Sequence, residues 1–388
     1  MNAPVEPAWP PGSHSSGHHS TAPLSTGHQT KGRLSSRSRP DVRVMIVDDS
    51  LIVRTVLSRI IDDADGYHIV AKASSAELAL AELDTITANV ILLDLEMPGM
   101  GGLDALPKIL AKANGAQVLV VSSLTDDGAE HTISAMQMGA ADTMLKPRSG
   151  GFDQPYRAAL LAKIRALCPR RGAAEPVSAA VLPPSPVLRP SPKISPQVLA
   201  IGASTGGIHA LCILLRHLPR QIDIPILVTQ HLPESFMNVF ARQLEVAGNR
   251  KAVVAGHRTR IERGTIVVAP GDGHMQIARN GADLCTTIGH YPVSSGCTPS
   301  VDPMFETLGQ AIGSRALGIV LSGMGRDGVE GAAKLVAAGG TVIAQDEQSS
   351  AVWGMPRAVA EAGLTSAILP PEAIARRIAA HAGAAAWK

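Results

Sequence analysis

Two long stretches of the chain alternate short runs of aliphatic and β-branched residues with segments of helical periodicity. This pattern restricts the fold more than any other feature, because it is typical of parallel sheets covered by helices. The expected strands are residues 43–47, 68–72, 90–93, 117–121 and 142–145 in the first stretch, and 197–202, 224–229, 265–269, 317–322, 341–344 and 366–369 in the second. The sequence therefore predicts an α/β protein with two doubly wound parallel-sheet domains.

Segments without periodicity bound the two stretches. Residues 1–40 are rich in Pro, Ser, Gly and His and have one acidic residue, so we expect a disordered tail. Residues 169–196 contain eight prolines, which predicts a semi-rigid, Pro-rich linker. The folded domains are then expected at 41–168 and 197–388.

Composition excludes several classes of protein. The net charge is only +2 and aromatic residues make up 3% of the chain, which argues against nucleic acid as a partner. The four cysteines are widely spaced and form no CxxC pair, which fits a reducing compartment. The sequence has no apolar run long enough to cross a bilayer and no secretory signal, so we expect a cytoplasmic protein without direct membrane insertion.

Charged and hydroxyl residues follow the strands of the first stretch. Asp48 and Asp49 follow the first strand, Asp94 the third, Ser122 the fourth and Lys146 the fifth. The carboxyl ends of parallel strands share one edge of a sheet, where ligands bind. Three carboxylates there suit Mg²⁺, and a lysine and a hydroxyl would contact a transferred phosphoryl group. Helix capping alone explains one such aspartate, but it explains the whole set poorly.

The first stretch resembles the receiver domain of two-component response regulators over residues 42–168. The matching motifs are VDDS (47–50), LLDLEMPGMGGL (92–103), VSSLT (121–125) and LKP (145–147). The resemblance implies a flavodoxin-like fold with Asp94 as the phosphoacceptor. It also implies that Asp48, Asp49 and Asp94, with the backbone carbonyl of Glu96, hold Mg²⁺ as the cofactor of phosphorylation.

The same resemblance assigns Ser122 and Lys146 to the phosphoryl group as the switch residues. Two positions depart from the family pattern. Gly101 stands where the family often has Asp, and Thr143 stands where an aromatic residue is usual. Phosphorylation is expected to survive both changes, whereas the second puts a rotating aromatic switch in question.

The second stretch contains a candidate nucleophile on a strand-to-helix turn. Gly202, Ser204 and Gly206 match G-x-S-x-G, which holds a serine above a sheet with backbone amides ready to bind an oxyanion. A phosphate-binding loop is the rival interpretation, because helix N-termini attract anions. The segment lacks the Gly-Lys-Ser/Thr of a P-loop and the spacing of a dinucleotide motif.

A serine nucleophile needs a base and an orienting carboxylate. His231 and Asp327 each follow a different expected strand, so they can meet Ser204 at one edge of the sheet. His274, with Asp272 beside it, competes with His231 for the role of base, and a buried structural histidine remains the alternative for either. The order Ser…His…Asp argues against an α/β-hydrolase fold.

The second stretch resembles the catalytic domain of the chemotaxis protein-glutamate methylesterases over residues 197–388. The matching motifs are IGASTGG (201–207), TQHLPESF (229–236), VVAPGDGHM (267–275), PSVDPMF (299–305), LSGMGRDG (321–328) and QDEQSSAVWGMP (345–356). The resemblance implies a Rossmann-like esterase domain and selects Ser204, His231 and Asp327 as the triad. Ile208 stands where the family usually has Pro. Thr298 replaces a common basic residue, which bears on how an acidic substrate surface is held.

The expected function is that of a phosphorylation-activated protein-glutamate methylesterase. It hydrolyses glutamyl methyl esters on chemoreceptors, releases methanol, deamidates receptor glutamines and needs no cofactor in the esterase site. Its partners are methyl-accepting chemoreceptors and a chemotaxis histidine kinase, and the unphosphorylated receiver is expected to cover the Ser204 face. A non-catalytic adaptor controlled by the receiver is the alternative, and a DNA-binding regulator lacks a helix-turn-helix pattern.

Overall fold

The computed structural model describes residues 41–123, 126–146, 152–168, 188–190 and 194–383. Its contacts divide the chain into residues 1–39 and residues 40–388, and everything described below belongs to the second unit. The predicted tail and most of the predicted linker lie outside the described residues. No helix in the described part of the chain is long and apolar enough to cross a membrane.

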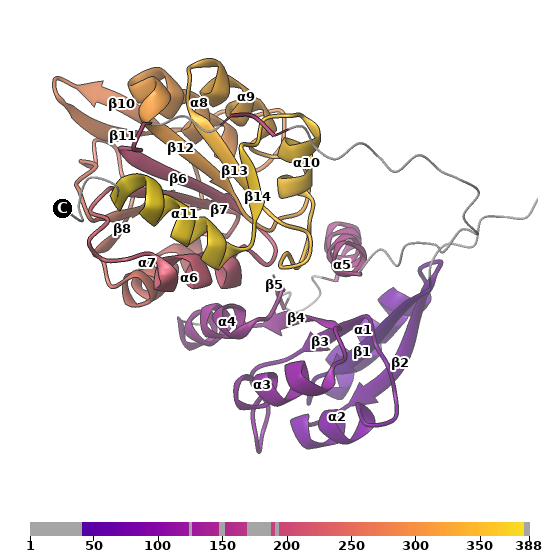
Figure 1. Cartoon of the computed structure of the whole chain (residues 1–388). Helices are drawn as coiled ribbons and strands as arrows, with labels where there is room; N and C mark the ends of the chain where they lie inside the picture. Colours follow the sequence, from indigo (N-terminus) through magenta and orange to yellow (C-terminus); the bar gives the residue numbers. More distant parts are fainter. Residues whose placement is uncertain (1–40, 124–125, 147–151, 169–187, 191–193, 384–388) are drawn as a thin grey trace, which may run out of the picture. The chain divides into compact units, whose positions relative to one another are not determined.

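The first domain carries a five-stranded parallel sheet in the order β2-β1-β3-β4-β5 (Figure 1). This is the flavodoxin-like order expected from the sequence. Its elements are β1 (Val42–Val47), α1 (Leu51–Asp62), β2 (Tyr67–Ala73), α2 (Ala76–Glu82), β3 (Val90–Leu93), α3 (Gly102–Lys112), β4 (Gln117–Ser122), α4 (Asp126–Met138), β5 (Asp142–Leu145) and α5 (Gln154–Leu167). Asp153 caps the last helix by accepting a hydrogen bond from the backbone N–H of Tyr156.

Alternate residues of each strand pack against helices on opposite faces of this sheet. Met45 and Val47 of β1 join the core under α2, α3 and α4, whereas Val44 and Ile46 join the core under α1 and α5. Strands buried on both faces read as continuous aliphatic runs, which is why they are visible in the sequence.

The second domain carries a seven-stranded parallel sheet in the order β14-β13-β12-β6-β7-β9-β8. Its elements are β6 (Val198–Ala203), α6 (Gly207–His217), β7 (Ile226–Gln230), α7 (Glu234–Gly248), β8 (Ala252–Val254), β9 (Ile266–Val268), β10 (His274–Asn280), β11 (Asp283–Gly289), α8 (Val301–Ile312), η1 (Gly313–Arg315), β12 (Ala316–Val320), α9 (Val329–Ala337), β13 (Thr341–Gln345), α10 (Met355–Glu361), β14 (Ala367–Leu369) and α11 (Pro371–Gly383).

Helices cover both faces of the larger sheet, with α6, α7 and α11 on one side and α8, α9 and α10 on the other (Figure 1). The chain starts at β6 and builds outward through β7, then returns to build the other half from β12. The strand order therefore reverses between β6 and β12. A ligand site is expected where this reversal opens the carboxyl edge of the sheet.

The predicted fold class, two parallel α/β sheets, is confirmed, with one addition. Strands β10 and β11 form a separate antiparallel hairpin with Asn280 opposite Asp283. Gly281 has a φ of +63°, which the tight turn requires. The Asn280-Gly281 dipeptide was an available turn signal, but the half-exposed flanking strands lack the aliphatic runs that marked the others.

Candidate functional site

Ser204 lies on the turn between β6 and α6, as the G-x-S-x-G match predicts. The turn is left-handed at Gly206, where φ is +75°, and a Cβ there would lie 2.5 Å from the Cβ of Ala351. A Cβ at Gly207 would lie 2.6 Å from the Cβ of Ala203. Only glycine fits this tight approach of backbone and sheet, so the small residues of the motif have a steric cause.

A network of buried polar groups braces the turn. The Ser204 N–H donates to the Ser322 carbonyl at 3.0 Å, and Gln230 Nε2 donates to the Ser204 carbonyl at 2.9 Å. The Ser322 hydroxyl donates to the Thr205 carbonyl at 2.7 Å. Because Gln230 ends β7 and Ser322 follows β12, both neighbouring strands fix the backbone on which Ser204 stands.

His231 and Asp327 meet at this edge of the sheet. Ala203 is paired with Gln230 in the register of β6 and β7, so Ser204 and His231 are the next residues on adjacent strands. His231 Nε2 lies 2.8 Å from Asp327 Oδ2. The structure therefore brings together the predicted base and carboxylate one strand away from the predicted nucleophile. Among the described residues, Ser204 Oγ forms no hydrogen bond to His231, and catalytic contacts of this kind often tighten only with substrate.

The Asp327 carboxylate is buried and held from the start of α8. The Ser300 hydroxyl donates to Oδ1 at 2.6 Å, and the Val301 N–H donates to Oδ2 at 2.7 Å. Burial would raise the pKa of Asp327, but the hydrogen bonds from His231, Ser300 and Val301 outweigh it and lower that pKa to about 2. Asp327 is thus a fixed negative charge that orients the imidazole.

A cysteine shares the surroundings of the imidazole. Ligand atoms of His231, Cys297 and Asp327 all lie within 4.8 Å of one another. Burial would lower the pKa of His231, but its hydrogen bonds to Asp327 and Cys297 raise the pKa to about 9. The resting imidazole is therefore favoured in its charged form at neutral pH.

The rival base, His274, is engaged elsewhere. It is 1% exposed, its Nε2 lies 2.8 Å from the Tyr291 carbonyl, and its Nδ1 accepts a hydrogen bond from the Ser300 N–H at 3.1 Å. Both ring nitrogens face the main chain, so His274 fits the alternative interpretation, that of a buried structural histidine. It supports the site indirectly, because it positions Ser300 against Asp327.

The second cluster lies at the carboxyl edge of the five-stranded sheet. Ligand atoms of Asp48, Asp49 and Asp94 lie within 4.8 Å of one another. Lys146 Nζ donates to Asp94 Oδ2 at 2.6 Å and lies 3.1 Å from Asp48 Oδ2. Among the described residues, the buried Ser122 hydroxyl has no hydrogen-bond partner, and Lys146 is the one cation beside Asp48 Oδ2. A hydroxyl without a partner fits a phosphoryl oxygen, and clustered carboxylate oxygens fit a bound cation.

Burial raises the pKa of Asp94 to about 6 although the Lys146 ammonium opposes the shift. Burial would lower the pKa of Lys146, but Asp94 and Asp48 outweigh it and raise that pKa. Asp94 Oδ1 also accepts a hydrogen bond from the Glu96 N–H at 3.1 Å. This set of oxygen donors suits a hard divalent cation.

The structure shows the conformation or burial of the four residues that depart from the family pattern. Gly101 has a φ of +30° at the start of α3, a conformation that disfavours residues with a Cβ. Thr143 is buried in β5, and its hydroxyl has no hydrogen-bond partner in the described part of the chain. Ile208 is buried among apolar side chains, whereas Thr298 is exposed ahead of α8.

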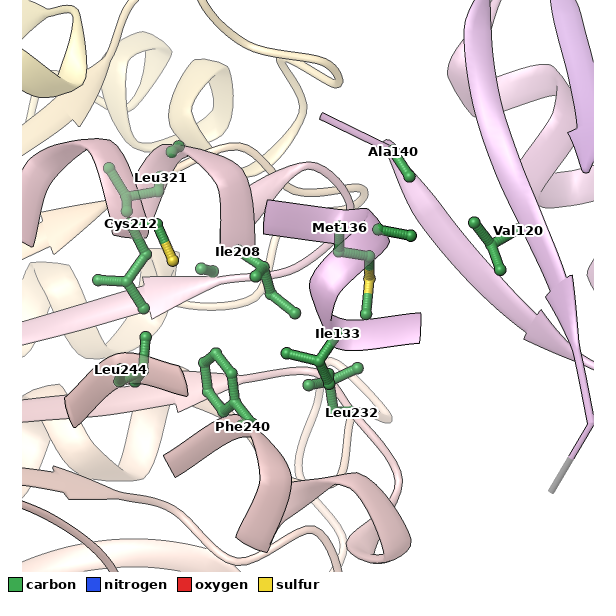
Figure 2. Close-up of a cluster of buried hydrophobic side chains, with 14 of the residues drawn as sticks. Val120, Ile133, Met136, Ala140, Ile208, Cys212, Leu232, Phe240, Leu244 and Leu321 are labelled. Atoms are coloured by element: carbon green, nitrogen blue, oxygen red, sulfur yellow. The ribbon is translucent and has the colours of Figure 1, made fainter. Parts of the chain in front are cut away.

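An apolar cluster joins α4 to α6 and to the segment before α7 (Figure 2). Ile133 and Met136 of α4 lie beside Ile208 of α6 and Leu232, which precedes α7. All four are buried, with Met136 only 4% exposed. The His209 Nδ1 of α6 lies 2.7 Å from the Gln137 carbonyl at the edge of this cluster. The two domains therefore share part of one hydrophobic core.

Polar contacts at β5 reach the turn itself. The Thr205 hydroxyl donates to Asp142 Oδ2 at 2.5 Å, and the Gly206 N–H donates to the Ala141 carbonyl at 2.5 Å. Asp142 is also paired with Lys163 of α5 at 2.6 Å. A carbonyl of the first domain thus accepts the hydrogen bond of a backbone amide two residues after Ser204.

Sequence reasoning missed three residues of these sites. Ser300 lies in the quoted PSVD motif, and its place before an expected helix was a usable signal. Nothing in the sequence pointed to Cys297 or to the contact of Asp142 with the turn, because both depend on loops and domain packing that strand periodicity does not encode.

Comparison with known proteins identifies the family of the chain. The family model described as CheB methylesterase matches residues 199–378, and the response regulator receiver domain model matches residues 44–151. Protein-glutamate methylesterase/protein-glutamine glutaminase 1 of Paramagnetospirillum magneticum is 40% identical over 88% of this chain and 96% of its own length. The chain belongs to this methylesterase family. A second such methylesterase, from Caulobacter vibrioides, is 43% identical over 88% of this chain and 99% of its own length.

Among solved structures, the CheB methylesterase catalytic domain of Thermotoga maritima is 30% identical, with a TM-score of 0.46 over 48% of this chain and 98% of that chain. Family membership confirms both resemblances drawn from the sequence and the predicted enzyme class, a protein-glutamate methylesterase with a receiver domain. It does not favour the alternative of a non-catalytic adaptor.

Proposed function

We propose that this methylesterase hydrolyses glutamyl methyl esters of chemoreceptors with Ser204, His231 and Asp327 as its triad. The observation that carries the proposal is the 2.8 Å contact of His231 with Asp327 beside the strand that ends at Ser204. Nucleophile, base and carboxylate follow three neighbouring strands, β6, β7 and β12.

In the proposed reaction, Ser204 Oγ attacks the ester carbonyl and passes its proton to His231. Asp327 engages Nε2, so Nδ1 is the nitrogen left to take the proton. Asp327 stabilises the imidazolium, which then protonates the departing methoxide to give methanol. Backbone amides near Thr205 and the start of α6 would bind the oxyanion.

Water completes the cycle. It attacks the acyl-enzyme, His231 takes its proton and returns it to Ser204, and free glutamate leaves. A receptor glutamine would follow the same route, with ammonia leaving in place of methanol, which gives the glutaminase activity.

The receiver domain is proposed to control this reaction through phosphorylation of Asp94. Asp48, Asp49 and Asp94, with the Glu96 carbonyl, would hold Mg²⁺. When bound, the ion supplies charge neutralisation for phosphoryl transfer. Lys146 and Ser122 would bind phosphoryl oxygens, and the unpartnered Ser122 hydroxyl supports that role. The phosphodonor would be a chemotaxis histidine kinase, and these partners imply a cytoplasmic location.

The unphosphorylated receiver is proposed to block the esterase. Support comes from the contacts of Ala141 with Gly206 and of Asp142 with Thr205, which bring receiver groups to the turn that follows Ser204. Phosphorylation would draw Lys146 and Ser122 to the new phosphoryl group and loosen the adjoining β5 and α4. Removal of residues 1–196 is expected to raise the basal rate, and an unchanged or lower rate would count against blocking.

The test is methanol release from methyl-labelled receptor with and without a small phosphodonor. Ser204→Ala should reduce turnover by several orders of magnitude. Asp94→Asn should keep the basal rate and abolish the response to the phosphodonor. Turnover that survives in Ser204→Ala would refute the serine mechanism, and a response that survives in Asp94→Asn would refute the assigned phosphoacceptor.

A further inference from the structure

Cys297 faces the catalytic imidazole from the segment between β11 and α8. Its ligand atom and those of His231 and Asp327 lie within 4.8 Å of one another. The three residues come from separate segments: the loop before α8, the end of β7 and the loop after β12. The proposed mechanism uses two of them and leaves the thiol without a role.

The donor set is typical of Zn²⁺ sites. Zinc binds thiolate, imidazole and carboxylate at about 2.0–2.3 Å, so tetrahedral ligand atoms lie roughly 3.3–3.8 Å apart. Donors already within 4.8 Å need to converge by about an ångström, and the 2.8 Å His231–Asp327 contact must open slightly. Cys297 lies in the loop before α8 and Asp327 in the loop after β12.

The surrounding hydrogen bonds suit a metal-binding carboxylate. The Ser300 hydroxyl and the Val301 N–H fix Asp327 by donating to its two oxygens. Outer partners of this kind orient ligands and increase metal affinity. The segment of Cys297 is held by a hydrogen bond of its N–H to Ser295 Oγ at 3.3 Å.

The cluster is reachable from solvent. The His231 side chain is 16% exposed, and Cys297 is half-buried. Three protein ligands with an accessible fourth position for water are the arrangement of an open zinc site. In contrast, Cys212 is fully buried in the core and acts there as a small apolar side chain.

We propose that Cys297, His231 and Asp327 form a Zn²⁺ site whose occupation reversibly stops the esterase. Binding displaces two protons to solvent, one from the Cys297 thiol and one from the His231 imidazolium, and the metal takes the imidazole nitrogen that is freed. The occupied imidazole can no longer accept the Ser204 proton. Inhibition rests on the proposed triad, whereas metal binding by the three donors does not.

The first test uses Co²⁺ as a spectroscopic substitute for Zn²⁺, in full-length protein with excess Mg²⁺ and no thiol reductant. A thiolate ligand gives Co²⁺ a sulfur-to-metal charge-transfer band. Carboxylates of the receiver and the histidines of the N-terminal segment cannot produce this band, because they offer no sulfur. We expect one equivalent of Co²⁺ to produce it and Zn²⁺ to displace it.

The matched variants are Cys297→Ser and Cys285→Ser, which remove partly buried thiols of neighbouring segments. The band should vanish in Cys297→Ser and in Cys297→Ala and persist in Cys285→Ser. Absence of the band from the wild-type protein, or its survival in Cys297→Ser, would overturn the site.

The second test measures methanol release against Zn²⁺ concentration, each variant relative to its own metal-free rate. Zn²⁺ should inhibit the wild-type enzyme, a chelator should restore the rate, and Cys297→Ser should need at least about tenfold more Zn²⁺. Equal sensitivity of Cys297→Ser and wild type would refute inhibition through this site. If the chain released no methanol at all, the proposed function would fail, while the cobalt band would still decide the metal site.

Discussion

Two neighbouring buried aspartates differ in how readily they take up a proton, because their hydrogen-bond donors differ. Asp327 receives hydrogen bonds from a histidine, a hydroxyl and a backbone amide. Asp302, two residues after Ser300, receives one from the Gly331 N–H at 2.6 Å. Burial raises the pKa of Asp302 to about 7, and the neighbouring negative charge of Asp327 adds to the shift. One carboxyl is thus kept ionised and the other is easily protonated.

The pH dependence of turnover follows from His231. A base with a pKa of about 9 is mostly protonated at pH 7, and its neutral fraction rises nearly tenfold per pH unit below that value. We therefore expect kcat/KM for methanol release to rise between pH 7 and pH 9 and then level. Asp327→Asn removes the charge that raises the pKa, so its much lower activity should level at a lower pH. A flat wild-type profile over this range would contradict the assignment of His231 as base.

Asp302 predicts an unusual dependence of stability on pH. Its folded pKa of about 7 exceeds the unfolded value of about 3.9, so the folded state binds the proton more tightly. The free energy of unfolding should therefore fall as pH rises from about 4 to 7. Asp302→Asn stays neutral and still accepts from Gly331, so it should be more stable than wild type at pH 8, by on the order of 1–2 kcal/mol, and similar near pH 4.

Thermal or urea unfolding at the two pH values measures this difference. Asp283→Asn, which alters an exposed carboxylate in β11, serves as the control and should change stability by less than about 0.5 kcal/mol at either pH. An Asp302→Asn protein that is less stable than wild type at pH 8 would show that the ionised carboxylate is stabilising.

At the scale of elements, the turn from β6 to α6 combines backbone strain with steric crowding. Gly206→Ala would place a Cβ 2.6 Å from Ser322 Oγ at a φ of +75°. We expect loss of most activity and a stability cost above the roughly 1 kcal/mol of a left-handed alanine alone. Gly281→Ala is the matched control, because its φ is +63° and no atom lies within 4 Å of the added Cβ. Similar losses in both variants, measured by unfolding and methanol release, would mean that crowding contributes nothing.

Strand ends were the part of the site that the sequence could predict. Ser204, His231 and Asp327 follow aliphatic runs, and parallel strands place their carboxyl ends together whatever the loops do. Sequence spacing could not decide between His231 and His274, because the deciding contacts are hydrogen bonds to the main chain around Tyr291 and Ser300. The hairpin of β10 and β11 was missed for a related reason, since its half-exposed strands have no continuous apolar run.

At the scale of the whole molecule, helix α4 offers a matched pair for testing receiver control. Met136 is 4% exposed in the shared apolar cluster, whereas Met138 is 39% exposed on the same helix. Met136→Glu would bury a carboxylate at the contact with Ile208, at a cost of more than 1.4 kcal/mol, enough to shift a two-state equilibrium tenfold. We expect the unphosphorylated rate to rise at least about tenfold and the response to phosphodonor to shrink.

Met138→Glu should leave the basal rate and the response unchanged. Methanol release from both variants, with and without phosphodonor, makes the comparison. If unphosphorylated Met136→Glu releases methanol no faster than unphosphorylated wild type, the α4 cluster does not restrain the esterase.

The Gly206 N–H donates to the Ala141 carbonyl. If the same amide binds the oxyanion in the proposed reaction, the carbonyl and the oxyanion would compete for it. A single enzyme molecule would then have no intermediate state in which this hydrogen bond is kept and hydrolysis proceeds at a reduced rate. Under the proposed control, graded signalling has to come from the proportion of molecules that are released at a given moment. The rate of demethylation would then depend on the number of released enzyme molecules, because each molecule would be either active or inactive.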